Sequence, residues 1–164
     1  MTVYHGKIYA RDKTFGIVVS RFNEYITGRL LEGAVTTLKK AGVLEKNIRV
    51  VWVPGGLEVP FFCKKLKTQT RFDAVIALSC VIRGGTYHFE CVSNELARGI
   101  DQVALETGTP VATGVITADN LEQAIDRAGL KSGNKGEQAA LAALEIASLN
   151  EQLTEKKSRR TKKR

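Results

Sequence analysis

The sequence has few cysteines and no long run of apolar residues, and each shortage excludes a class of protein. Its 164 residues include only Cys63, Cys80 and Cys91, and no two of them form a C-x-x-C pair. We therefore expect no zinc site and no redox dithiol, and we predict free thiols, with Cys80 and Cys91 in the core. The longest apolar run, residues 74–82, is far shorter than the roughly 18–20 residues of a membrane-spanning helix. The first ten residues lack the apolar stretch of a signal peptide, so we expect a soluble cytoplasmic protein.

Acidic residues are outnumbered, but the excess positive charge lies mostly at one end. The net charge is +8, of which residues 151–164, with seven Lys or Arg and two Glu, carry +5. The remaining 150 residues carry only +3. We predict an N-terminal arm of residues 1–11, one domain of residues 12–153 and a disordered basic tail of residues 154–164. Packaging of nucleic acid by the tail is a competing function that we do not expect, because charge runs are usually only solvated.

The sequence also lacks G-x-G-x-x-G and the P-loop pattern G-x-x-x-x-G-K-[ST], so neither a dinucleotide site nor a nucleotide triphosphate site is supported. Instead, short apolar runs alternate with amphipathic segments. This alternation predicts a parallel sheet with helices on both faces, an α/β fold. The expected strands are residues 14–20, 48–53, 73–82 and 110–117, and the expected helices are residues 23–41, 58–68, 88–107, 120–128 and 136–153. The alternating pattern of residues 1–10 predicts an extended arm that pairs with another sheet.

The unusual residues of the chain follow the predicted strands. Ligands of open parallel sheets bind beyond the carboxyl ends of the strands. Residues 21–23, 54–58, 83–88 and 117–119 would meet there. Within them, residues 84–86 (Gly-Gly-Thr) precede a helix, where free backbone N–H groups suit a phosphate. The alternative is that this turn needs glycine for its backbone conformation and binds nothing.

Four side chains near this edge could serve chemistry or only structure. His88 could carry protons at neutral pH, or it is an ordinary surface histidine. Phe22 could stack on a flat heterocycle, or it packs on the following helix as a hydrophobic staple. Arg127 could clamp a phosphate, or it only interacts favourably with a helix C-terminus. Lys135 lies in a glycine-rich turn, where it is a second candidate for an anion or simply a solvated lysine.

Several segments together resemble the lumazine synthase family. They are RFNEYIT (21–27), VWVPGGLEVPF (51–61), FDAVIALSCVIRGGTYHFE (72–90) and TADNLEQAIDRAGLKSGNKG (117–136). The resemblance implies a flavodoxin-like three-layer α/β/α sandwich with a four-stranded parallel sheet. It also implies the condensation of 5-amino-6-(D-ribitylamino)uracil with 3,4-dihydroxy-2-butanone 4-phosphate. The product is 6,7-dimethyl-8-ribityllumazine, an intermediate of riboflavin biosynthesis, and phosphate and water are released.

The resemblance further implies the partners and the site. No cofactor or metal takes part, subunits form homopentamers that in some members build an icosahedral shell, and the arm pairs with a neighbouring subunit. Riboflavin synthase is a possible further partner. By resemblance, His88 transfers protons, and Gly85, Thr86 and Arg127 bind phosphate. The ribitylaminouracil site is formed by Phe22, Gly56, Leu57, Glu58, Cys80, Val81, Ile82, Thr113 and Lys135, and the adjacent subunit supplies Thr113, Arg127 and Lys135.

A second function remains open on the same fold. A non-catalytic module that binds a flavin or a lumazine would use the same pocket, because fold alone does not determine activity. The combination of His88, Arg127 and Lys135 favours an enzyme, since a passive binder needs no proton carrier.

Overall fold

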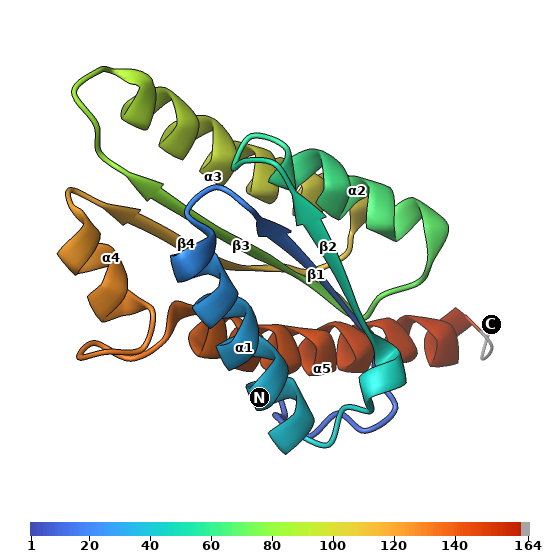
Figure 1. The fold of residues 1–164 in the computed structure, drawn as a ribbon. Coiled ribbons are helices and arrows are strands. Elements are labelled where there is room, and N and C mark those ends of the chain that lie inside the picture. Colours follow the sequence, from blue (N-terminus) through green and yellow to red (C-terminus); the bar gives the residue numbers. More distant parts are fainter. Residues whose placement is uncertain (162–164) are drawn as a thin grey trace.

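The chain forms a single four-stranded sheet in which all strands are parallel (Figure 1). The computed structural model describes the backbone of residues 1–161 and the side chains of residues 1–154. The strand order is β2-β1-β3-β4, and Ile17 of β1 pairs with Val50 of β2 and Ile76 of β3. The elements in chain order are β1 (Phe15–Ser20), α1 (Glu24–Lys40), a short 3-10 helix (Glu45–Asn47), β2 (Ile48–Val53), α2 (Val59–Gln69), β3 (Ala74–Ile82), α3 (His88–Thr107), β4 (Val111–Ala118), α4 (Leu121–Arg127) and α5 (Lys135–Thr161).

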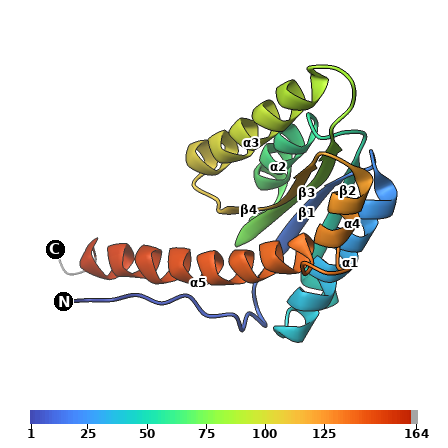
Figure 2. The ribbon, with the colours of Figure 1, turned by 90° about the vertical axis from the view of Figure 1, so that its left-hand side faces the viewer.

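Helices cover both faces of this sheet and create two cores. Helices α2 and α3 lie on one face, and α1, α4 and α5 lie on the other (Figures 1 and 2). Strands β1 and β3 are buried on both faces, which explains their nearly continuous apolar sequences. One core joins α1, α4 and α5 to residues such as Ile17 and Leu78, and the other joins α2 and α3 to residues such as Val18 and Ala77. The predicted α/β/α sandwich with a four-stranded parallel sheet is confirmed.

The direction of the chain changes at β1, and this change determines where a ligand fits. From β1 the chain moves outward to β2 and then returns to β3 on the other side of β1. The connections from β1 and β3 therefore leave the sheet toward opposite faces, and a crevice opens beyond the carboxyl ends of these strands. None of the described helices is long and apolar enough to cross a membrane.

The C-terminal end of the chain differs from the sequence-based expectation, whereas the N-terminal arm is extended as predicted. Helix α5 continues to Thr161, whereas we predicted a helix that ends near Leu153 and a disordered tail. Glutamate, lysine and arginine all have high helix propensity, and they allow the helix to continue; residues 162–164 lie outside the described residues. The first residues run extended along α5 (Figure 2), where the side chain of Gln152 donates to the carbonyl of His5 at 2.9 Å. Pairing of this arm with a neighbour stays a prediction.

Candidate active site

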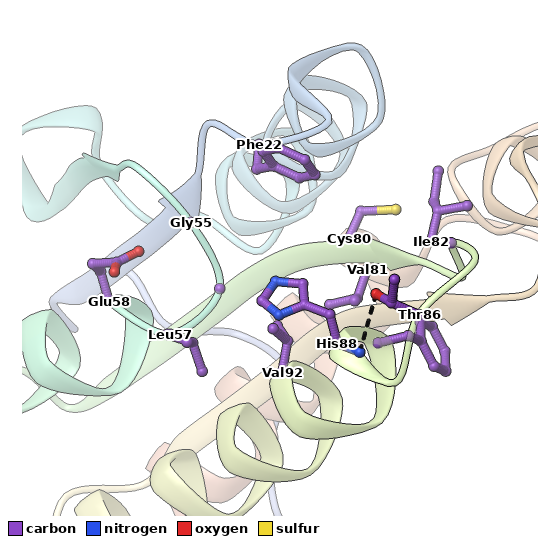
Figure 3. A pocket seen from close by; sticks show the side chains of 13 residues that line it. Phe22, Gly55, Leu57, Glu58, Cys80, Val81, Ile82, Thr86, His88 and Val92 are labelled. Atoms are coloured by element: carbon purple, nitrogen blue, oxygen red, sulfur yellow. Dashed lines mark hydrogen bonds between the residues drawn. The ribbon is translucent and has the colours of Figure 1, made fainter.

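A pocket of about 360 Å³ lies beyond the carboxyl ends of β1, β2 and β3 (Figure 3). This volume falls in the range of small-molecule sites. Most of the site residues that the sequence predicted line it together, although they are up to 66 positions apart, from Phe22 to His88. The lining residues are Phe22, Gly55, Gly56, Leu57, Glu58, Cys80, Val81, Ile82, Gly84, Thr86, His88, Phe89 and Val92.

The chain directly after β1 is held in an unusual conformation that presents Phe22. Asn23 has φ +60°, in the left-handed region that residues other than glycine rarely adopt. Its side-chain amide donates to the carbonyl of Cys80 at 3.0 Å, and the N–H of Phe22 donates to the carbonyl of Pro54 at 3.0 Å. The connection is thus tied to both neighbouring strands. The ring of Phe22 is 71% exposed at the pocket mouth, so it does not act as a hydrophobic staple and its face is free for a ligand.

The turn after β2 approaches the floor of the pocket closely because it contains Gly56. A Cβ atom at this position would lie 3.2 Å from the hydroxyl of Ser79 and 3.2 Å from a methyl group of Leu96. The Ser79 hydroxyl is itself buried and hydrogen-bonded to the hydroxyl of Ser20 at 2.9 Å. Glycine therefore lets the main chain of Gly56, Leu57 and Glu58 border the pocket, and Glu58 places a carboxylate at its edge.

The end of β3 forms the floor of the pocket, and its chemistry is mainly that of the main chain. Cys80 is buried, while Val81 and Ile82 are half-buried. Burial raises the pKa of the Cys80 thiol to about 12. This pKa favours a neutral thiol at physiological pH, which is unsuited to the role of a nucleophile. Cys63 is also buried, but Cys91 is exposed, so its predicted core position was wrong: it lies one position before Val92 on α3 and points away from the core.

The loop from β3 to α3 brings a hydroxyl and an imidazole to the same side of the pocket. The N–H of His88 donates to the Thr86 hydroxyl oxygen at 3.4 Å, and the imidazole of His88 points into the pocket (Figure 3). Gly84 and Gly85 precede them with ordinary negative φ values, and an added Cβ at either would meet nothing within 4 Å. Neither backbone conformation nor packing within this chain requires these two glycines. Their open surroundings instead favour the close approach of a ligand.

An arginine fixes this loop to the rest of the molecule. The Nε atom of Arg83 donates to a carboxylate oxygen of Asp119 at 2.9 Å, its guanidinium also pairs with Glu90, and it lies 4.2 Å from the centre of the Phe89 ring. These partners raise the pKa of Arg83, chiefly through the hydrogen bond that Arg83 donates to Asp119, and Arg83 in turn lowers the pKa of Glu90. The positive charge of Arg83 is therefore already balanced by two carboxylates.

Four predicted site residues do not line the pocket of this chain. Gly85 lies in the loop between two lining residues but does not border the pocket. Thr113 is exposed on β4, Arg127 is exposed at the end of α4, and Lys135 is half-buried at the start of α5. The lining residues consequently include no lysine or arginine within the described chain.

Other residues of the site were not recognised from the sequence. Phe89 and Val92 line the pocket because they face it from the first turns of α3. Asn23 and Arg83 have positioning contacts that the sequence did not reveal. For Asn23 a signal existed, since asparagine directly between a strand and a helix often adopts the left-handed conformation. The partners of Arg83 are seven and 36 positions away, so no local pattern reveals them.

The pocket combines an aromatic face, a carboxylate, an imidazole and open backbone N–H groups near a helix start. Such a set can hold a flat heterocycle and an oxyanion and can move protons between them. Among the described residues, no three His, Cys, Asp or Glu side chains are grouped as a metal ion would require.

Comparisons with known proteins point to one family. The family model described as 6,7-dimethyl-8-ribityllumazine synthase matches residues 12–151. A protein of Clostridium kluyveri with the name 6,7-dimethyl-8-ribityllumazine synthase is 52% identical over 153 residues, which covers 93% of this chain and 99% of that protein. A protein of the same name from a second strain of this species has the same identity and coverage.

Proposed function

The chain belongs to the 6,7-dimethyl-8-ribityllumazine synthase family, and we propose that it is the synthase itself. It condenses 5-amino-6-(D-ribitylamino)uracil with 3,4-dihydroxy-2-butanone 4-phosphate in riboflavin biosynthesis. The observation that carries this proposal is the pocket, which gathers Phe22, residues 56–58, residues 80–82, Thr86 and His88 around one cavity. These residues come from three different strand ends, and each has a role that the reaction needs.

The uracil substrate occupies the part of the pocket between β1 and β3. Its ring stacks on the exposed face of Phe22 and binds the main chain of Val81 and Ile82, while Glu58 and Gly56 hold the ribityl chain. This assignment is supported by the tie from Asn23 to the Cys80 carbonyl, which fixes the spacing between the aromatic ring and the floor. A fixed distance between the Phe22 ring and the floor of the pocket suits a flat heterocycle such as the uracil ring.

The phosphate of the second substrate binds at the start of α3, to backbone N–H groups of Gly84 and Gly85 and to the Thr86 hydroxyl. The open surroundings of both glycines and the favourable helix N-terminus support this position. Arg83 is not the counter-ion, because Asp119 and Glu90 already balance it. A cation from elsewhere is needed, and Arg127 of an adjacent subunit supplies it, together with Lys135 and Thr113 for the uracil.

His88 carries the protons of the reaction. The 5-amino group attacks the ketone, and water leaves as the imine forms. Removal of a proton from the carbon skeleton then expels phosphate, the resulting enol tautomerises to a ketone, and the ribitylamino nitrogen closes the ring with loss of a second water. The imidazole of His88 points into the pocket that is proposed to hold both reactants (Figure 3), which supports its role as the proton carrier. Positioning of two bound reactants supplies much of the acceleration.

The assembly is a homopentamer in the cytoplasm, and further association into an icosahedral shell is part of this proposal. Exposed large apolar side chains support an assembly, since Phe22, Tyr87 and Phe61 are each more than 60% exposed. Mass measurement in solution distinguishes a pentamer from a shell. The three free thiols support a reducing compartment.

Sharing of the site between subunits is tested by complementation. Chains with His88→Ala and chains with Arg127→Ala are unfolded together and reassembled. If His88 and Arg127 of one site come from different chains, some sites of the mixed assembly contain both native residues, and kcat/KM rises above the mean of the two parent proteins. Mixed assemblies whose activity equals that mean would contradict the sharing.

The activity itself is tested by direct turnover. Purified protein is mixed with both substrates, and the fluorescence of the lumazine product is followed against a protein-free control, because the two reactants also combine slowly on their own. Clear acceleration is expected. A folded assembly that leaves the rate at background but binds a flavin or lumazine stoichiometrically would replace the synthase with the binding-module function.

A further inference from the structure

The turn between α4 and α5 is organised by one buried asparagine. Helix α4 ends at Arg127 and α5 begins at Lys135, and the turn folds back so that Ala128 forms a β-bridge with Asn134. Residues 129–133 of this turn are exposed, whereas Asn134 is only 9% exposed. The two cations that the proposed function assigns to substrates thus flank a single buried side chain.

The amide of Asn134 makes as many hydrogen bonds as an asparagine side chain can comfortably make. Its nitrogen donates to the carbonyl of Arg29 on α1 at 3.0 Å and to the carbonyl of Ala128 at 3.2 Å. Its oxygen accepts from the N–H groups of Gly136 at 2.8 Å and Glu137 at 3.3 Å. Both donors and both lone pairs are therefore used. The accepting half caps α5, and the donating half binds two carbonyls outside that helix.

Two glycines close the space around this amide. A Cβ atom at Gly33 would lie 2.7 Å from the side-chain oxygen of Asn134, and a Cβ atom at Gly136 would overlap the carbonyl of Leu30. Helices α1 and α5 can approach each other at this point only because neither residue has a side chain. The close approach of Gly33 confines the amide, and its four hydrogen bonds favour a single orientation.

We propose that Asn134 is a positioning residue that fixes Arg127 and Lys135 relative to each other, an inference that rests on the proposed substrate contacts of these two cations. The carbonyl of Ala128, which Asn134 holds, belongs to the residue after Arg127, and Lys135 follows Asn134 directly. Arginine and lysine have long, flexible side chains, so the region that their charged groups can reach depends on the position of their Cα atoms. The amide of Asn134 fixes the backbone next to both residues and ties it to α1.

The substitution Asn134→Asp separates this role from helix capping. Aspartate caps a helix N-terminus about as well as asparagine does, so the accepting half is preserved. The donating half is lost, and a carboxylate would face the carbonyls of Arg29 and Ala128. We expect KM for both substrates to rise about tenfold or more, because Arg127 and Lys135 would each lose a charged hydrogen bond to a substrate. The kcat value at saturation should change much less. A purely structural role would instead reduce the folded fraction, lowering kcat with unchanged KM.

A matched control is available on the neighbouring helix. Asn120 caps α4 by accepting from the N–H of Gln123 at 3.0 Å, and it is exposed. Asn120→Asp should leave both KM values unchanged. If Asn134→Asp does not fold, Gly33→Ala displaces the same amide through a methyl group and should raise the same KM values. Gly28→Ala on the same helix, where an added Cβ meets nothing within 4 Å, is its control.

The outcomes separate this inference from the proposed function. Wild-type protein without turnover would overturn the proposed function. Turnover with an unchanged KM for the butanone phosphate in Arg127→Ala would overturn the role of Arg127. If Arg127→Ala raises this KM but folded Asn134→Asp leaves both KM values unchanged, the positioning role of Asn134 is wrong. In the double variant, the two effects on the phosphate KM should be clearly less than additive, because Asn134 acts through Arg127.

Discussion

Asn23 combines an unfavourable backbone conformation with a favourable hydrogen bond, and two substitutions can separate these effects. The residue has φ +60° and donates to the carbonyl of Cys80 at 3.0 Å. Asn23→Ala loses the hydrogen bond and places a residue with a Cβ in the left-handed region. Asn23→Gly also loses the hydrogen bond, but glycine adopts this conformation without steric cost.

The expected magnitudes follow from these two effects. Loss of the hydrogen bond costs about 1 kcal/mol of the free energy of unfolding. The left-handed conformation costs a residue such as alanine about 1–2 kcal/mol. Glycine avoids this cost, but the greater freedom of the unfolded chain lowers the free energy of unfolding by about 0.5–1 kcal/mol. Asn23→Ala should therefore be the less stable variant, by up to about 1.5 kcal/mol, which corresponds to roughly 3–6 °C in Tm for a chain of this length.

Thermal unfolding followed by circular dichroism, at one protein concentration for all three proteins, measures these differences. Both variants should melt below wild type, with the alanine variant lowest. Each should also raise KM for the uracil substrate, because the ring of Phe22 would no longer be held at a fixed distance from the floor. Equal melting temperatures for the two variants would refute the conformational argument. A wild-type melting temperature in both would show that the bond to Cys80 contributes nothing.

Three further results are expected. His88→Ala should retain partial turnover, because positioning supplies much of the rate; complete loss with both substrates still bound would contradict this division. A thiol reagent at pH 8 should leave Cys63 and Cys80 unmodified until the protein unfolds, since burial excludes the reagent and raises both pKa values to about 12; rapid labelling of three thiols per folded chain would contradict it. Because Arg83 lowers the pKa of Glu90, the pair stabilises the folded state above the ordinary glutamate pKa of about 4.3 and loses this effect as pH falls through the lowered value. The difference in Tm between wild type and Glu90→Gln should therefore shrink below about pH 4, and a difference independent of pH would count against the pairing.

The strands and helices could be predicted because their signals are local. Apolar runs such as residues 74–82 have the length and composition of buried strands, and a glycine or proline follows several elements, as Gly42 follows α1 and Pro54 follows β2. The edge that carries the site also followed from the sequence, since parallel strands bring their carboxyl ends together. Contacts between distant positions could not be predicted in this way. The four bonds of Asn134 and the two ion pairs of Arg83 depend on how helices and loops pack in three dimensions.

The pocket of the described chain lacks the positive charge that a phosphate ester needs. Among the described residues that line the pocket, Glu58 is the only Asp, Glu, Lys or Arg, and its carboxylate does not attract a phosphate ester. The nearby guanidinium of Arg83 is balanced by carboxylates, so it stabilises the loop without offering its charge. Under the proposed function, positive charge arrives only with Arg127 and Lys135 of a neighbouring copy. Binding of the phosphate ester, and with it the elimination step, would then depend on assembly, and the buried amide of Asn134 in one chain would determine the geometry of catalysis in the next.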